Sequence, residues 1–224
     1  MTQPLVIYGA GGFAREVLQI VLDINAASAT PVWEPLGFVV DSAFAGAESV
    51  HGLAVLDGPD WLQKNPAAFV VIAIGAPAAK RRIADEVKAT SGNPFASLVH
   101  PRAWMGRNVQ IGQGAIVCAG CLVTTDIRIG DHVHVNIGCT IGHDAELQDF
   151  VTLNPSVKVS GNVRIGTGSE IGTGSILIPH ANVGEWSIVG AGALVTKPLP
   201  GNVTAVGSPA KAIKSRPANW HLET

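Results

Sequence analysis

The feature that most constrains this chain is a six-residue repeat that begins at Val99 and ends at Val195. A helix repeats about every 3.6 residues and one face of a strand about every 2, so neither accounts for a period of six. Such a period is typical of a β-solenoid. We therefore predict short strands joined by corners, three strands to a triangular coil, with the repeating side chains inside. The repeating positions, aliphatic or Met with no slip in register, are Val99, Met105, Ile111, Val117, Val123, Ile129, Val135, Ile141, Leu147, Leu153, Val159, Ile165, Ile171, Leu177, Val183, Val189 and Val195.

The corners of the repeat carry a second restriction. The residue four places after each aliphatic position is mostly small, which suits a tight inward corner. Cys121 and Cys139 occupy equivalent corners one coil apart, and Cys118 lies close to the first. An odd count of three Cys argues against a disulfide framework, and a single CxxC is a weak metal signal. We therefore interpret these cysteines as small packing residues.

Composition limits the class of protein. The chain has 224 residues, enough for two modest domains, and its 26 Gly, 14% charged and 5% aromatic residues are typical of an aliphatic, strand-rich protein. A net charge of −2 does not suggest binding to nucleic acid. The chain has no apolar run of membrane-spanning length and begins without the pattern of a secretory signal, so we expect a cytoplasmic protein that does not enter a membrane.

The residues before the repeat predict a Rossmann-like α/β domain over residues 1–96. A short apolar strand at 5–8 is followed by the glycine turn Gly9-Ala10-Gly11-Gly12-Phe13-Ala14 and a helical pattern at 15–24. Such a turn lets a phosphate approach backbone N–H groups at a helix N-terminus. A second strand at 36–40 ends at Asp41, and a third at 69–74 ends at Gly75.

We predict that Gly9, Gly11, Gly12, Asp41 and Gly75 line a nucleotide-binding site. An acidic residue at the end of the second strand can hold a ribose hydroxyl or a base edge. The segment is only about half the length of a full doubly wound dinucleotide domain, which favours a nucleotide-linked substrate over NAD. The alternative is a purely structural glycine turn. A further helical pattern at 78–89 carries Lys80, Arg81 and Arg82.

The glycine-rich start, the hexapeptide coils and the later segment Val206-Gly207-Ser208-Pro209-Ala210-Lys211-Ala212-Ile213 together resemble one family. Over residues 4–214 the chain is similar to the sialic acid O-acetyltransferase-like hexapeptide-repeat acyltransferases, which include bacterial nucleotide-sugar N-acetyltransferases. The resemblance implies that residues 97–214 form a left-handed β-helix, that acetyl-CoA is the cosubstrate, and that the protein is a homotrimer. Residues 215–224 form a polar tail, either disordered or laid on a neighbouring subunit.

The sharpest match lies between Asn136 and Asp144, where the family places a catalytic His followed by an acidic residue. The residues support the same reading independently. His143 occupies a corner position that should face outward, and an imidazole can accept a proton near neutral pH. Asp144 either orients this ring or is an ordinary corner residue. The resemblance implies that His143 is the general base for direct attack on the thioester, without an acetyl-enzyme.

The resemblance also implies the remaining site residues. Gly161, one coil after His143, would direct its backbone N–H at the thioester carbonyl, and Lys211 would lie near a phosphate of coenzyme A in a groove between two subunits. Asn136 either contacts the substrate or belongs to a structural ladder of stacked Asn side chains. Some members carry a second active-site His where this chain has Thr152, which leaves the role of that position open.

We therefore predict an acetyl-CoA-dependent N-acetyltransferase that acts on the amino group of a nucleotide-linked amino sugar. The alternatives are O-acetylation of a sialic acid or another sugar, and a non-catalytic hexapeptide scaffold. A zinc-dependent carbonic anhydrase of this fold needs two His five residues apart, and no pair of His has that spacing, so we expect no metal. The other histidines are interpreted as surface or packing residues: His51, His100, His132, His134, His180 and His221.

Overall fold

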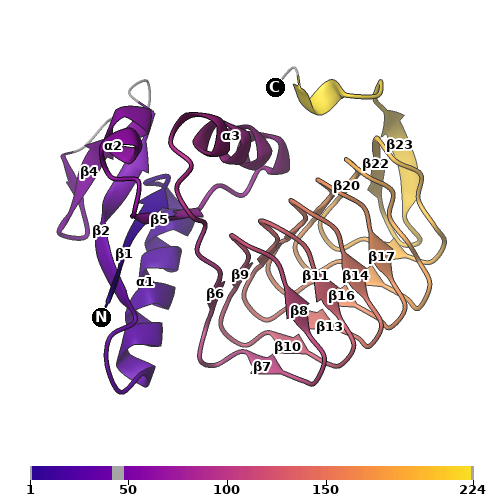
Figure 1. Ribbon diagram of the computed structural model, residues 1–224. Helices are drawn as coiled ribbons and strands as arrows, with labels where there is room; N and C mark the ends of the chain where they lie inside the picture. The colour runs from indigo at the N-terminus through magenta and orange to yellow at the C-terminus, as the bar shows by residue number, and fades with distance from the viewer. Residues whose placement is uncertain (1, 42–47, 223–224) are drawn as a thin grey trace.

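The structure is a computed structural model that describes residues 2–41 and 48–222. Residues 1 and 42–47 of the predicted first domain, and 223–224 of the predicted tail, lie outside the described residues. An amino-terminal α/β part lies beside a triangular β-helix, and the carboxy-terminal segment returns toward the first part (Figure 1). Among the described residues, no helix has the length and apolar character needed to cross a membrane.

The amino-terminal part is built on a five-stranded sheet with the order β3-β4-β2-β1-β5. Its strands run parallel except for β3, which pairs antiparallel with β4. The sequence pattern predicted three strands and missed β3 and β4, because these short strands are partly exposed and show no regular alternation. The strands are β1 (Gln3–Tyr8), β2 (Trp33–Val40), β3 (Ser49–Val50), β4 (Leu53–Asp57) and β5 (Phe69–Ile72).

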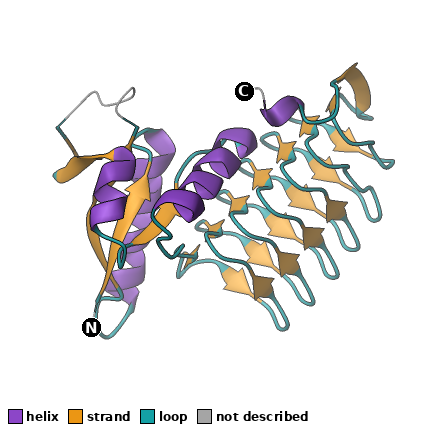
Figure 2. Cartoon of the chain, turned by 45° about the horizontal axis from the view of Figure 1, so that its top comes forward, coloured by secondary structure: helices purple, strands orange, loops and turns teal. Residues whose placement is uncertain are grey.

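Three helices pack against this sheet: α1 (Gly12–Ala27), α2 (Gly58–Lys64) and α3 (Pro77–Thr90). Figure 2 shows them in purple around the amino-terminal strands. Helix α1 begins earlier than the pattern at 15–24 predicted, because Gly11 is its N-cap in an extended conformation. Helix α3 begins at a proline, which suits a first helical position because the N–H there needs no partner in the helix.

The repeat folds into a left-handed β-helix, as the resemblance implied. Its strands pair in parallel with residues eighteen apart, as Leu122 does with Thr140 and Thr140 with Lys158. The first sheet consists of β6 (Leu98–Val99), β9 (Ile116–Val117), β12 (His134–Val135), β15 (Thr152–Leu153), β18 (Glu170–Ile171), β20 (Ile188–Val189), β22 (Val203–Val206) and the antiparallel β23 (Lys211–Ser215). The second consists of β7 (Trp104–Met105), β10 (Leu122–Val123), β13 (Thr140–Ile141), β16 (Lys158–Val159), β19 (Ile176–Leu177) and β21 (Leu194–Val195). The third consists of β8 (Gln110–Ile111), β11 (Arg128–Ile129), β14 (Glu146–Leu147) and β17 (Arg164–Ile165).

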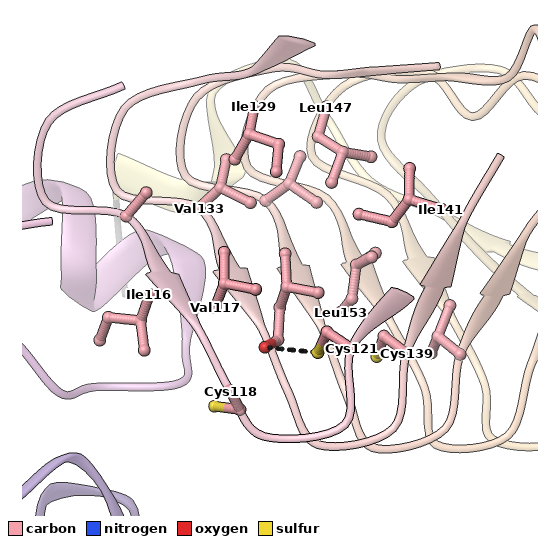
Figure 3. Close-up of a cluster of buried hydrophobic side chains, with 14 of the residues drawn as sticks. Ile116, Val117, Cys118, Cys121, Ile129, Val133, Cys139, Ile141, Leu147 and Leu153 are labelled. Carbon is pink, nitrogen blue, oxygen red and sulfur yellow. Dashed lines mark hydrogen bonds between the residues drawn. The ribbon is translucent and has the colours of Figure 1, made fainter. Parts of the chain in front are cut away.

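The aliphatic positions of the repeat form the core of the prism, as predicted (Figure 3). All of them from Val117 onward are buried, whereas Val99, Met105 and Ile111 are half-buried because they belong to the first coil, which no earlier coil covers. Cys121 and Cys139 are fully buried among them, and their thiols donate hydrogen bonds to the carbonyl oxygens of Asn136 and Asn154 at 3.1 and 3.2 Å. These cysteines therefore serve as small packing residues.

The amino-terminal part contacts the outer face of the first sheet. The ring of Phe13 in α1 lies 5.2 Å from that of His134, and the Asp23 carboxylate lies 2.8 Å from the ring of His100. The fully buried Lys80 of α3 donates to the hydroxyl of Thr152 at 3.0 Å. That hydroxyl in turn donates to the carbonyl of Gly75 at 2.8 Å. Thr152, whose role the sequence left open, therefore joins α3 to the β-helix.

The corner of the β-helix between the third sheet and the first also contacts the amino-terminal part. His132 is fully buried there, edge-on to Phe95 at 4.5 Å and stacked on Phe150 at 5.2 Å. Neither ring nitrogen of His132 has a hydrogen-bond partner in the described part of the chain. Burial therefore lowers the pKa of His132 to about 4.

This buried imidazole predicts a loss of stability in mild acid. In the unfolded chain His132 takes up a proton below about pH 6.5, but in the folded protein only near pH 4, so the free energy of unfolding falls as pH drops through that window. The loss is on the order of 3 kcal/mol at the lower end. Urea unfolding between about pH 7.5 and pH 4.5 measures it.

A matched pair of variants assigns this effect. His132→Phe keeps the aromatic packing and removes the titrating group, so its stability should depend less on pH. His180→Asn removes an exposed histidine at a left-handed corner position that Asn tolerates, and should leave the dependence unchanged. An unaltered acid slope in His132→Phe would contradict the assignment.

The carboxy-terminal segment lies on its own chain. After β23 it forms the short helix η2 (Trp220–Leu222), the yellow coil next to the C-terminus in Figure 1. Its His221 stacks on Trp186 of the β-helix and contacts Arg81 of α3. Residues 216–222 are therefore ordered on their own chain, and contact of the tail with a neighbouring subunit stays a prediction. The sequence did not show the fold-back because it depends on two partners far away in the chain.

Candidate active site

His143 lies on a corner between the second and third sheets, after β13. Its side chain is exposed, as the position in the hexapeptide predicted, and its relative exposure is 60%. Its Nδ1 lies 2.7 Å from the carboxylate oxygen Oδ2 of Asp144. A carboxylate can only accept, so Nδ1 carries the proton and donates. This leaves Nε2 of the neutral ring with a free lone pair, which is the atom that a general base needs.

The position of Asp144 has a local structural reason as well. Its φ is 59°, in the left-handed region, as in Asn108, Asp126 and Asn162 at the equivalent corners of other coils. Asn and Asp tolerate this conformation because their short polar side chains can bond locally. Asp144 is thus both an ordinary corner residue and the hydrogen-bond partner of His143, so the two readings of the sequence are compatible.

Gly161 lies directly against the ring of His143. A Cβ built on Gly161 would stand 2.7 Å from both Cε1 and Nε2 of His143, closer than real contacts allow. The residue one coil after His143 must therefore be glycine if the imidazole is to keep its place. The backbone of Gly161 consequently lies beside the proton-accepting nitrogen.

A separate cavity of about 540 Å³ opens at the carboxyl ends of the amino-terminal strands. Its walls are mostly apolar, and it includes the glycine turn at Gly9 and Gly11 together with Asp41. This is the edge of a parallel α/β sheet at which ligands usually bind. The cavity therefore brings together three of the residues that the sequence assigned to a nucleotide site.

Two residues of this cavity were not assigned from the sequence. Tyr8 donates a hydrogen bond to the Asp41 carboxylate, and burial together with this bond raises the pKa of Tyr8. Arg82 of α3 also lines the cavity and is the one cationic side chain among its described lining residues. Arg82 was visible only as part of a basic helical pattern, and the signal for Tyr8 was its place immediately before the glycine turn.

The other predicted site residues lie elsewhere. Gly12 is the first residue of α1 and borders a shallower cleft with Arg15, while Gly75 accepts its hydrogen bond from Thr152 at the contact between α3 and the β-helix. Asn136 donates through Nδ2 to the carbonyl of Leu153 at 3.0 Å, whereas Asn154, one coil later, donates to the Glu170 carboxylate. Lys211 is exposed on β23. Roles for these residues in binding stay predictions.

Among the described residues, the cavity and the His143 corner do not meet within one chain. Every contact between the amino-terminal part and the β-helix described above involves the first sheet or the corners beside it. His143 follows the second sheet, on another side of the prism. One chain therefore presents two separate candidate sites.

Comparisons with known proteins bear on both sites. The PglD N-terminal domain model matches residues 4–87. GDP-perosamine N-acetyltransferase of Escherichia coli is 30% identical over 225 residues, which cover 95% of this chain and 97% of that protein.

The chain belongs to the PglD-like family of hexapeptide-repeat acetyltransferases.

Solved structures of this family superpose on the chain almost end to end. The acetyltransferase domain of PglB from Neisseria gonorrhoeae has a TM-score of 0.85 and 30% identity, and the match covers 95% of this chain and 100% of that one. PerB from Caulobacter crescentus, solved in complex with CoA and GDP-perosamine, has a TM-score of 0.85 and 27% identity over 94% and 97% of the two chains. The PglB domain has also been solved in complex with acetyl coenzyme A.

The contact between Gly161 and His143 predicts the effect of a single methyl group. Gly161→Ala should displace the imidazole without unfolding the coil, because the ring is the flexible partner. A misplacement of about 1 Å can cost roughly 100-fold in rate, so we expect acetyl transfer to fall by about 10- to 100-fold at an unchanged melting temperature. Steady-state kinetics and a thermal melt test this, with Ser160→Ala as the neighbouring control. Normal turnover in Gly161→Ala would show that the ring position does not matter.

Proposed function

We propose that this protein is an acetyl-CoA-dependent N-acetyltransferase that acts on the amino group of a nucleotide-linked amino sugar. The observation that carries the proposal is the His143–Asp144 pair on its corner, with proton-accepting Nε2 placed against Gly161. Of the relatives named above, the Escherichia coli protein is a GDP-perosamine N-acetyltransferase, and PerB binds CoA together with GDP-perosamine. An intact His–Asp pair argues against the non-catalytic scaffold.

The reaction needs one base and one polarising donor. The neutral sugar amine attacks the thioester carbonyl, and His143 Nε2 takes up the proton that the nitrogen loses as the C–N bond forms. Asp144 holds the ring in the correct tautomer and stabilises the imidazolium. The backbone N–H of Gly161 stabilises the oxyanion, and the C–S bond then breaks to release coenzyme A. No acetyl-enzyme is required, because the amine itself is the nucleophile.

The amino-terminal cavity suits the nucleotide part of the acceptor. The glycine turn at Gly9 and Gly11 leads into the N-terminus of α1, where backbone N–H groups and the helix dipole favour a phosphate. Arg82 adds a cation for the diphosphate, and Asp41 can accept a hydrogen bond from a ribose hydroxyl or from a base N–H. The apolar walls contact the faces of the base and sugar.

Because the two candidate sites of one chain are separate, we propose that the complete site forms between subunits of a homotrimer. The second sheet, next to the His143 corner, exposes Trp104, Leu122 and Ile176, with relative exposures of 57%, 48% and 44%. Apolar side chains gathered on one face are typical of a surface covered by another chain. Coenzyme A would lie between two β-helices, with Gly161 at its thioester and Lys211 near a phosphate. The cosubstrate suggests a cytoplasmic reaction.

The proposed function is tested by incubating the protein with acetyl-CoA and a panel of UDP-, GDP- and dTDP-linked amino sugars. Mass spectrometry should reveal the gain of one acetyl group on one of them. The product should survive mild alkali, because an amide does and an acetate ester does not. An alkali-labile product would instead indicate O-acetylation, and no acetylated product from any sugar would refute the proposal.

His143→Ala should lower kcat by roughly 100- to 10,000-fold, the usual contribution of a general base. The KM for acetyl-CoA should change little, because the variant removes a proton acceptor and not a binding contact. Asp144→Asn should cost less, since it retains the corner conformation and loses only the orienting carboxylate. Assays between about pH 6 and pH 9 test this. Near-normal turnover of His143→Ala throughout that range would show that His143 is an ordinary surface residue and not the general base.

Changes in the amino-terminal cavity should affect the acceptor alone. A Cβ at Gly11 meets no atom within 4 Å, so Gly11→Val should fold normally and occupy space that the ligand needs. Arg82→Ala removes a charged hydrogen-bond donor, whose loss costs roughly 10-fold or more in affinity. We expect a higher KM for the nucleotide sugar in both variants and an unchanged KM for acetyl-CoA. Arg102→Ala, at an exposed position on the first coil, is the control.

A further inference from the structure

The segment after β23, residues 216–222, has no part in the proposed reaction, yet one of its side chains, His221, is packed against the rest of the chain. We refer to it as the C-terminal strap. In Figure 1 it turns back from β23 and crosses toward α3. Its His221 is only 6% exposed although it lies close to the end of the chain. Burial of this kind requires specific partners, because chain ends are otherwise poorly ordered.

His221 joins two parts of the molecule that are distant in sequence. Its ring stacks on Trp186 of the β-helix, with centroids 3.5 Å apart and planes 5° from parallel. The ring atom Nε2 of His221 lies 3.2 Å from Nη1 of Arg81 in α3. Within the strap itself, the Arg216 guanidinium lies 4.4 Å from the ring of Trp220. The strap thus connects the late coils to α3.

The β-helix holds Trp186 in a fixed position for this contact. Trp186 is only 4% exposed, and its ring lies over Gly168 of the preceding coil. A Cβ at Gly168 would stand 2.2 Å from Cζ3 of Trp186, so any larger residue would push the indole away. Gly168, Trp186, His221 and Arg81 are therefore successive neighbours, and Arg81 also approaches the Trp186 ring.

Arg81 is adjacent in sequence to a residue of the acceptor cavity. Arg81 also pairs with Asp85 at 3.5 Å, and its guanidinium lies 5.6 Å from the Trp186 ring. The next residue, Arg82, lines the cavity of the glycine turn on one side and the small cleft beside His221 on the other. Because consecutive residues of a helix move together, fixing Arg81 also fixes the backbone from which Arg82 projects.

We propose that the C-terminal strap positions α3, and with it Arg82, for binding the diphosphate of the acceptor. Arg81 and His221 are positioning residues in this proposal and do not touch the substrate. The second attachment of α3, from Lys80 to Thr152, keeps the helix in place when the strap is absent, so loss of the strap loosens α3 without unfolding the protein. The identity of the occupant rests on the proposed function, but the contact between strap and helix does not.

The first experiment measures hydrogen exchange in the ligand-free protein. Truncation after Ser215 removes the strap and leaves β23 complete. Amides of α3 should then exchange about tenfold faster, while those of the β-helix core stay unchanged, because aromatic stacking and cation–π contacts contribute roughly this much to an equilibrium. His221→Phe keeps the stack on Trp186 but loses the contact to Arg81, so it should show a smaller increase than the truncation.

The second experiment measures binding by calorimetry. UDP, GDP and dTDP serve as probes, and the one that binds the intact chain best is titrated into the truncated chain, Arg81→Ala and His221→Phe. We expect its affinity to fall about threefold to tenfold, with coenzyme A binding unchanged. Arg81→Ala in the truncated chain should add little further loss, because both changes break the same link. Arg102→Ala is the matched control.

Three outcomes decide the matter. Unchanged exchange in α3 and unchanged diphosphate affinity in the truncated chain would overturn the proposal. An equal loss of coenzyme A and diphosphate affinity, with a lower melting temperature, would also overturn it, since it would show general destabilisation. If none of the three diphosphates binds the intact chain, the proposed acceptor is wrong, and the exchange experiment alone then decides whether the strap holds α3.

Discussion

The structure depends on the stacking of inward aliphatic side chains in an eighteen-residue register. Each coil buries its apolar residues against those of the coils before and after it, as Ile141 does between the coils of Val123 and Val159. Each fully buried side chain of this size stabilises the fold by about 1.5–3 kcal/mol, and a slip of one residue would turn the whole row toward water. The register is therefore strongly fixed, and it determines the position of every outward side chain.

The catalytic corner is a consequence of this register. His143 and Gly161 meet because they occupy the same position in successive coils, and only a residue without a side chain leaves room for the imidazole. The left-handed turn that closes each coil also favours Asn or Asp, so Asp144 reaches His143 at no additional conformational cost. The same geometry explains why Gly168 seats Trp186 at another corner. At these two positions glycine leaves room for a ring that a neighbouring coil places against the backbone.

The contact between the amino-terminal part and the β-helix depends on buried polar side chains and not on the repeat. It buries Lys80, His132 and His134, and burial holds the pKa of each below its ordinary value. Lys80 is satisfied by Thr152, whose hydroxyl also bonds the Gly75 carbonyl. Polar groups that are costly to bury fix the orientation of α3 more narrowly than apolar packing would. The acceptor cavity on one side of α3 and the C-terminal strap on the other both depend on that orientation.

The sequence by itself determined the β-helix, its inward residues, the glycine turn of the amino-terminal part and the His143–Asp144 pair. Each of these follows from the spacing of residues that are close together in the sequence. A strict period leaves one way to bury the apolar residues, and a corner position fixes which side chain faces outward. Only the tertiary structure decided that Thr152 anchors α3, that Tyr8 and Arg82 join Asp41 at the cavity, and that the tail folds back onto Arg81 and Trp186. These contacts join residues far apart in the chain, and no periodic pattern relates the partners. The sequence pattern also missed β3 and β4, because their partly exposed residues show no regular alternation of apolar and polar side chains.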